Sequence, residues 1–189
     1  MGGMPAEINY PEIGICGLAC RLCPAYQRES ESRCDGCKTE SRMNAGCSLV
    51  TCALKRKGVE FCWVCGESDS CARWKRHRDF GRQHDSFKCY QTLDDDILFI
   101  RRNGVDEFDA LVRQREQVLK AMLNEFNEGR SKGYYCIAAT VLELDELEDA
   151  LAEARKRSAG LGLKEKSGGL HSLLEAAAVA KNRTLKLRK

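Results

Sequence analysis

The spacing of cysteines constrains this chain more than any other feature of its sequence. Ten of the twelve cysteines lie in the stretch from residue 16 to residue 71, and no histidine lies among them. Two pairs, Cys34–Cys37 and Cys62–Cys65, have the Cys-x2-Cys spacing of a metal knuckle. Such a turn points two thiolates at one ion and lets backbone N–H groups approach the sulfurs. The sequence therefore predicts a unit that folds around bound metal.

The same stretch holds few large apolar residues, so it cannot build a strong core alone. Structural zinc contributes on the order of 10 kcal/mol to the folding of a small domain. A zinc site takes four Cys or His ligands in a tetrahedron, so ten clustered cysteines can fill two sites. The predicted ligands are Cys16, Cys20, Cys23, Cys34, Cys37, Cys47, Cys52, Cys62, Cys65 and Cys71.

Spacing does not say which cysteines share an ion. One arrangement completes the Cys34–Cys37 pair with Cys47 and Cys52. The Cys62–Cys65 pair would then be completed by Cys71 and one or more of the three cysteines at 16, 20 and 23. Either set of four cysteines would satisfy a tetrahedral site. Other groupings remain open, because knuckles in small metal domains often interleave.

Iron–sulfur ligation is the alternative to zinc. The run Cys16-x3-Cys20-x2-Cys23 is followed directly by Pro24, and a proline directly after a ligand cysteine occurs in bacterial ferredoxins. With 4Fe-4S clusters the protein would serve electron transfer or form a subunit of a redox complex. A third hypothesis is metal handling, in which ten thiols give a labile site for delivery or sensing.

The order and spacing of these cysteines resemble the family catalogued as domain of unknown function 3795. The residues that carry the resemblance are Cys16, Gly17, Leu18, Cys20, Cys23, Pro24, Ala25, Tyr26, Cys34, Gly36, Cys37, Cys47, Cys52, Ala53, Lys57, Gly58, Cys62, Cys65 and Cys71. The family usually has a proline before the last cysteine, where this chain has Ser70. The resemblance implies a metal-binding module and no established reaction.

The cellular compartment is inferred from what the sequence lacks. The N-terminus has neither the basic nor the apolar region of a signal peptide. The longest apolar runs, such as 134–142, fall far short of the roughly 20 residues that cross a bilayer. We therefore expect a cytoplasmic protein with no membrane span, in which clustered thiols stay reduced and available to metal.

From residue 92 onward the sequence shows helical patterns in place of clustered cysteines. Thr92 and Asp95 resemble a capping box that starts a helix over 93–102. Apolar residues then recur at three- and four-residue steps from Phe108 to Phe126, which predicts a long amphipathic helix. The apolar element 134–142 favours helix over strand because its centre is rich in alanine, and a further helix is expected from Asp145 to about 158.

The C-terminal segment has a different composition from the body of the chain. Four glycines between 160 and 169 predict a linker, followed by a short helix over 170–182 and a basic end. Residues 155–189 carry a net charge of +8, whereas the whole chain carries +3. This basic tail predicts a polyanion or a protein as partner, and the basic, aromatic stretch 73–88 also makes nucleic acid a candidate.

These observations predict an α-dominated protein in three parts. Residues 1–90 form a small cysteine-rich, metal-stabilised domain with short helices, 91–158 form a helical domain, and 159–189 form the linker and tail. Cys89 and Cys136 lie outside the cysteine pattern, and their role is open. The chain has no nucleophile elbow, phosphate-binding glycine loop or HExxH motif, so a non-enzymatic binding role is favoured over an enzyme.

Overall fold

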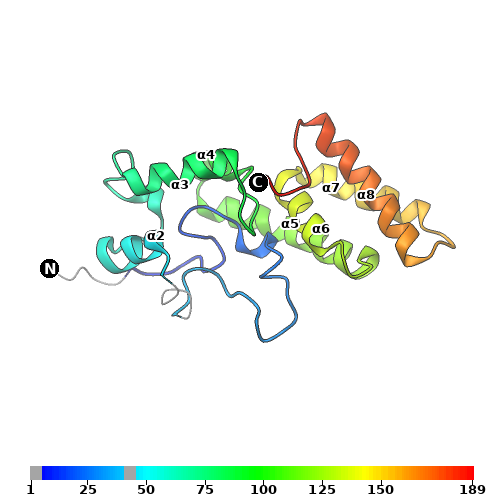
Figure 1. The fold of residues 1–189 in the computed structure, drawn as a ribbon, viewed down its shortest axis with the longest axis horizontal. Coiled ribbons are helices and arrows are strands. Elements are labelled where there is room, and N and C mark those ends of the chain that lie inside the picture. Colours follow the sequence, from blue (N-terminus) through cyan, green and yellow to red (C-terminus); the bar gives the residue numbers. More distant parts are fainter. Residues whose placement is uncertain (1–5, 41–45) are drawn as a thin grey trace.

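The computed structural model describes residues 6–40 and 46–189 of the chain. Helices supply the regular structure of these residues, which contain no strand and only an isolated antiparallel bridge between Ile13 and Ala19. Figure 1 shows coil and short helices at one end of an elongated molecule and the longer helices at the other. The prediction of an α-dominated fold is confirmed.

The cysteine-rich segment is built from turns and short helical pieces. These are the 3₁₀ helices η1 (Cys20–Leu22) and η3 (Cys62–Val64), with α2 (Ser48–Val50) continuing directly into the π-helix η2 (Thr51–Lys57). Gly58 ends η2 in the left-handed conformation, with φ of 62°, which a glycine adopts without strain. Phe61 stacks on Trp63 with their ring centroids 4.3 Å apart, which gives this segment a small apolar centre.

Two helices connect the cysteine-rich segment to the rest. They are α3 (Ala72–Gln83) and α4 (Leu93–Asn103). Helix α4 begins where the sequence predicts, but Thr92 makes no side-chain cap with the backbone. Its hydroxyl donates instead to the Asp96 carboxylate at 3.0 Å, so the predicted capping box is wrong.

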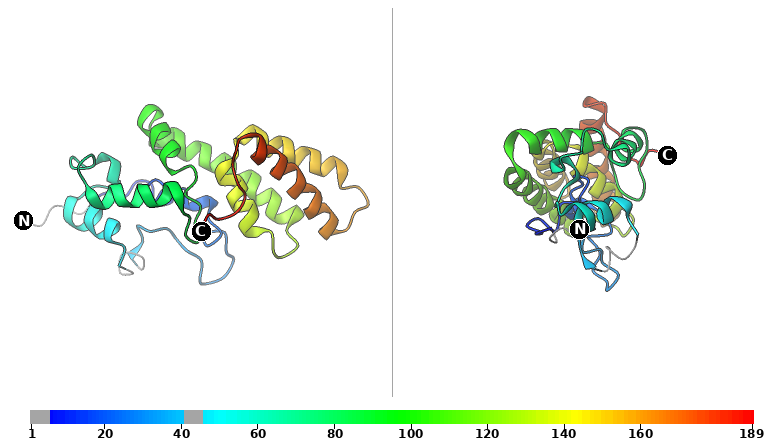
Figure 2. Two further views of the ribbon diagram at one scale, coloured as in Figure 1. Left: turned by 45° about the horizontal axis from the view of Figure 1, so that its top comes forward. Right: turned by 90° about the vertical axis from the view of Figure 1, so that its left-hand side faces the viewer.

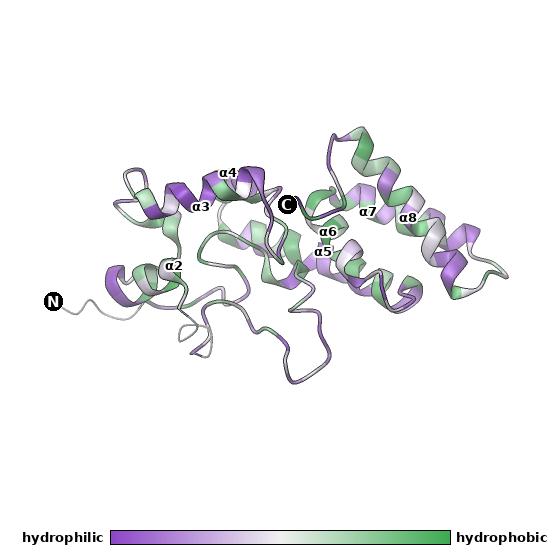
Figure 3. Ribbon diagram, viewed as in Figure 1, coloured by the Kyte–Doolittle hydropathy of each residue, from purple (hydrophilic) through white to green (hydrophobic). Residues whose placement is uncertain are grey.

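Four helices form the other end of the molecule. They are α5 (Val105–Phe126), α6 (Lys132–Val141), α7 (Leu144–Arg157) and α8 (Leu163–Ala180). The apolar stripe predicted on α5 is buried at Phe108, Val112, Val118, Leu119, Met122 and Phe126. Figure 3 shows hydrophilic and hydrophobic stretches alternating along α5, α7 and α8, as amphipathic helices require. Helix α7 starts with a capping box between Glu143 and Glu146.

Helix α8 corrects the predicted linker. Residues 163–169 belong to the helix, which packs along α7 (Figures 1 and 2). Its buried face is Ser167, Leu170, Leu174 and Ala178, spaced by three or four residues, while a Cβ added at Gly168 or Gly169 would point into open space. The exposed glycines and lysines hid this stripe, because composition weighs all positions alike.

Buried residues from Ile13 to Leu185 form one contiguous cluster. It includes Trp63 of the cysteine-rich segment, Ile97 of α4 and Leu170 of α8. The predicted domain boundary at residues 90 and 91 is therefore crossed by packing, and the division into domains stays a prediction. Among the described residues no helix combines the length and the apolar character needed to cross a membrane.

A buried polar network ties α5, α6 and α8 together. The hydroxyl of Tyr135 donates to the carbonyl of Phe126 at 3.1 Å, and it lies 3.0 Å from the hydroxyl of Ser167. Ser131 lies 3.1 Å from Ser167, and its hydroxyl lies 2.8 Å from the imidazole Nε2 of His171. Ser131 is 1% exposed, so this serine–histidine pair has no access for a substrate and is part of the packing.

The buried stripe of α8 can be tested with one substitution. We expect Leu170→Ala to lower the free energy of unfolding by about 2–5 kcal/mol, because it leaves a cavity in a fully buried position. Leu163→Ala in the same helix is the control, since Leu163 is 47% exposed and should cost well under half as much. Chemical denaturation of both variants measures the difference, and equal effects would return residues 159–169 to the role of a linker.

Candidate metal centre

The cysteines divide into two groups, each lining its own space. Four of them, Cys52, Cys62, Cys65 and Cys71, line a small space of about 30 Å³. Others line a cavity of about 370 Å³, namely Cys20, Cys23, Cys34, Cys37, Cys47, Cys89 and Cys136. We call these the small site and the large cavity.

Three separate elements bring the small site together. Cys52 lies on η2, Cys62 and Cys65 flank the single turn of η3, and Cys71 directly precedes α3. Burial, together with neighbouring thiols that include Cys16 and Cys71, raises the pKa of the Cys62 thiol to about 12. Thiols packed this closely ionise together only when a cation offsets their charge, which is what a bound metal does.

A tight turn forms the wall of the large cavity. Gly36, inside the Cys34–Cys37 pair, has φ of 97°, and a Cβ there would lie 2.7 Å from the carbonyl oxygen of Pro11. The same position is 3.8 Å from the sulfur of Cys20, so the turn lies against η1. Burial raises the pKa of the Cys20 thiol to about 12, and the thiol of Cys37 adds to the shift. Glycine is required here because any side chain would strike the backbone.

Cys16 lies between the two groups. Burial, against a backbone hydrogen bond from Leu18 and with the thiols of Cys37 and Cys47, raises the pKa of its thiol to about 11. Cys16 in turn is the first of the thiols that raise the pKa of Cys62. Its sulfur therefore lies near members of both groups, and spacing gave no sign of this position.

The structure differs from the arrangement that placed Cys47 and Cys52 in one quartet. Cys47 lines the large cavity and Cys52 lines the small site. Cys47 lies in extended backbone before α2, whereas Cys52 lies within η2, so the two residues reach different walls. Cys71 likewise joins Cys52 rather than Cys20 or Cys23.

The sulfurs are gathered but not fixed at the distances of ion ligands. Within 6–40 and 46–189, no three His, Cys, Asp or Glu side chains stand close enough to hold a metal ion as they are placed. An ion would have to draw the thiols of either group together. The donor set itself is suited to the task, because thiolates select zinc, cuprous copper and iron–sulfur clusters.

Comparison with known families agrees with the cysteine pattern. Residues 12–76 match the model of a family described as "Protein of unknown function (DUF3795)". We call residues 12–76 the DUF3795 segment. The match confirms the resemblance seen in the sequence and covers all ten clustered cysteines. No curated protein and no solved structure matches the chain.

A buried ion pair joins two parts of the DUF3795 segment to each other and to Tyr10, which precedes the segment. The ammonium of Lys38 lies 2.6 Å from the carboxylate of Glu60, donates to the carbonyl of Tyr10 at 2.9 Å and lies over the ring of Phe61. Lys38 is 2% exposed and directly follows Cys37. The pair thus fixes the Cys34–Cys37 turn against the buried residues around Phe61.

Residues outside the DUF3795 segment complete the large cavity, and three of them carry groups that could bind metal. Cys89, Asp96 on α4 and Cys136 on α6 all line it. Asp96 is the last of three consecutive aspartates. The other two form ion pairs, Asp94 with Arg78 and Arg82, and Asp95 with Arg183. A run of acidic residues in a first helical turn is explained by the helix dipole, so the sequence pattern does not single out Asp96.

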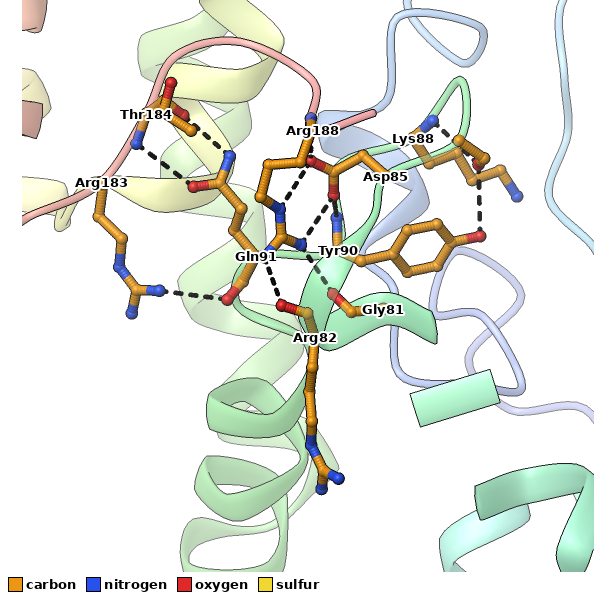
Figure 4. A network of polar contacts seen from close by, with 10 residues as sticks. Gly81, Arg82, Asp85, Lys88, Tyr90, Gln91, Arg183, Thr184 and Arg188 are labelled. Atoms are coloured by element: carbon orange, nitrogen blue, oxygen red, sulfur yellow. Dashed lines mark hydrogen bonds and ion pairs between the residues drawn. The ribbon is translucent and has the colours of Figure 1, made fainter. Parts of the chain in front are cut away.

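The C-terminal residues close one side of the large cavity. Leu187 lines the cavity, and Arg188 pairs with Asp85 at 3.0 Å while donating to the backbone carbonyls of Gly81 and Arg82 (Figure 4). The backbone of Arg188 also exchanges hydrogen bonds with Asp85. Gln91 and Thr184 form a second pair of bonds in Figure 4. The basic end is therefore docked on the protein.

The docking of the C-terminal end rests on Arg188. We expect Arg188→Ala to cost about 2 kcal/mol or more, because it leaves the buried Asp85 carboxylate without its cation. Faster hydrogen exchange at the amides of Asp85 and Arg188 should accompany the loss. Lys186→Ala, at an exposed position, should change stability by no more than about 0.5 kcal/mol. Unchanged exchange in the Arg188 variant would contradict the docked arrangement.

Asp96 should make stability depend on pH. Burial raises the pKa of its carboxyl from 3.8 to about 7, so its contribution to stability is complete below about pH 4 and is lost as the pH rises through 7. At pH 8 we expect Asp96→Asn to raise the free energy of unfolding, by at most about 4 kcal/mol at 1.36 kcal/mol per pKa unit. At pH 5.5 the gain should be about 2 kcal/mol smaller.

Asp94→Asn is the matched control for the pH experiment. Arg78 and Arg82 hold the pKa of Asp94 below its ordinary value against the opposing effect of burial. Its contribution is therefore present above pH 4, and the substitution should destabilise the protein at pH 8. Denaturation curves of both variants at the two pH values measure the effects. A loss of stability on Asp96→Asn at pH 8 would show that the carboxylate is favourably paired.

Proposed function

We propose that the DUF3795 segment binds metal, most favourably zinc, and that the protein is a metal-binding module acting through contacts with protein or nucleic acid. The observation that carries the proposal is the small site. Its four cysteines come from η2, η3 and the start of α3, and they line one small space. Four thiolates are the number and type of ligand that a structural zinc site takes.

The size and surroundings of the small site support a single ion. About 30 Å³ is room for one or two water-sized groups, and the wall also includes Leu49, Val59 and Trp74. The apolar part of the wall strengthens the attraction between a cation and thiolates, and Lys57, Ser68 and Arg73 also line the space. Metal binding here would supply folding free energy to a segment whose apolar centre is small.

The large cavity favours the second candidate, iron–sulfur ligation. It offers more room than one ion needs, and Cys20, Cys23 and Pro24 from the ferredoxin-like run all line it. Cys34, Cys37 and Cys47 supply further thiols on the same walls. A 4Fe-4S cluster in this cavity would give the protein a role in electron transfer or in a redox complex.

The charge pairing of the basic segments bears on the expected partners. Arg155 pairs with Glu125, Arg183 with Asp95, and Arg188 with Asp85. A polyanion would therefore compete with internal ion pairs, and exposed lysines such as Lys164 and Lys189 are its better contacts. Binding through these lysines would be weak and would fall steeply with salt.

Metal analysis of the purified protein tests the proposal. We expect about two zinc ions per chain in colourless protein that was purified without oxygen. Cys62→Ser should lose the ion of the small site, and Cys37→Ser should lose the ion of the large cavity. Both losses should lower the melting temperature, because metal binding is coupled to folding.

Cys89→Ser is the matched control for these substitutions. Cys89 lines the large cavity, but its pKa responds mainly to burial and to Gln91 rather than to another thiol, so its loss should leave the metal content unchanged. If the purified protein is brown and contains iron and sulfide, the zinc proposal is wrong and the iron–sulfur alternative is supported. Protein without any metal, and with unchanged melting in the Cys62 and Cys37 variants, would refute both.

A further inference from the structure

The large cavity extends beyond the thiols that would hold metal. Its volume of about 370 Å³ falls in the range of small-molecule sites, and it lies where the DUF3795 segment meets α4, α6 and the C-terminal residues. The wall is mainly apolar and includes Leu18, Leu22, Tyr26, Phe87, Ile137 and Leu187. An apolar wall with a few polar groups is typical of sites for organic ligands.

Asp96 supplies an unpaired carboxylate to this wall. Its Oδ2 accepts a hydrogen bond from Thr92, and among the described residues it forms no ion pair. Its neighbours Asp94 and Asp95 both have arginine partners. Burial of this carboxylate costs more than the attraction of Arg115 returns, and a cationic ligand would offset that cost.

The cavity wall also carries a positive charge, the ammonium of Lys88, which lies near the thiols. Lys88 also lines the cavity, and the thiols of Cys20, Cys16 and Cys37 are the neighbours that favour its ammonium form. Thiolates bound to a metal would use the charge of Lys88. The groups around Asp96 are different, namely Thr92, Arg115 from α5, Asp95 on the same helix and Glu143 before α7. Asp96 is thus the carboxylate of the cavity wall, with neighbours that differ from those of Lys88.

Two exposed apolar residues mark an entrance. Phe87 is 61% exposed and Leu187 is 39% exposed, and both line the cavity. Phe87 follows α3, whereas Leu187 lies beside Arg188 in the docked C-terminal end shown in Figure 4. Apolar side chains at the mouth would contact the body of an entering ligand.

We propose that the large cavity binds a small organic ammonium ion with an apolar body, held through its N–H groups by the carboxylate of Asp96. The apolar body packs against Leu22 and Ile137, and Leu187 covers it at the entrance. A charge-assisted hydrogen bond in an apolar site gives about 10- to 100-fold discrimination over a neutral analogue. The proposal does not depend on the identity of the metal.

Calorimetric titration of the full chain, with its metal content measured in the same sample, tests the proposal. The probes are 2-phenylethylamine, the neutral isostere 2-phenylethanol and the anion 3-phenylpropionate. We expect the amine to bind at least tenfold more tightly than either analogue at pH 8. Asp96→Asn should weaken the amine tenfold or more and leave the alcohol unchanged, whereas Asp95→Asn, on the same helix, should change neither.

Each other outcome overturns the proposal. Equal binding of the amine and the alcohol would mean that Asp96 does not recognise charge. Tighter binding of 3-phenylpropionate would make the site one for anions at Lys88. Loss of metal from the Asp96→Asn protein would make Asp96 a metal ligand. Absence of amine binding in protein with full metal content would reject the ammonium site and leave the metal proposal intact.

Discussion

Burial of thiols beside one another is the constraint on which the cysteine-rich end depends. Each buried thiol resists ionisation, and each ionised neighbour would make the next ionisation harder, as Cys16, Cys20 and Cys62 show. The segment has two ways to satisfy this constraint. Its thiols stay protonated and pack as small apolar groups, or a cation makes them thiolates together. The second state adds the cohesion that a segment made mostly of turns lacks.

The long helices give these turns a rigid wall. Helix α5 packs against α4, α6, α7, α8 and η1, so it is central to both ends of the molecule. Arg21 of η1 pairs with the buried Glu116 of α5 at 3.0 Å and with Glu12 at 3.0 Å. These pairs explain why a glutamate lies at a buried position of an apolar stripe. They also orient η1, and with it Cys20, against the helices.

Periodicity predicted much of the helical end and composition misjudged one part of it. The stripe from Phe108 to Phe126 follows from the positions of apolar residues, and the helix around residues 134–141 follows from its alanine-rich centre. A helix is also expected over 170–182, but the first turns of α8 are assigned to a linker because they are rich in glycine and lysine. The ten cysteines were found by spacing, but their grouping depends on which way helices η2 and α3 present Cys52 and Cys71, which spacing does not encode.

The role of Asp96 could not be predicted from the sequence, and the reason is physical. Three identical residues in one helical turn differ only in their direction, and direction is decided by how α4 packs on the rest of the chain. Two of them meet arginines from α3 and from the C-terminal end, and the third meets a cavity. Since the walls of that cavity come from the DUF3795 segment, α4, α6 and the last residues together, the cysteine-rich segment alone would not form it. The proposed metal binding thus rests on the segment, whereas the proposed recognition of an organic ligand rests on the whole chain.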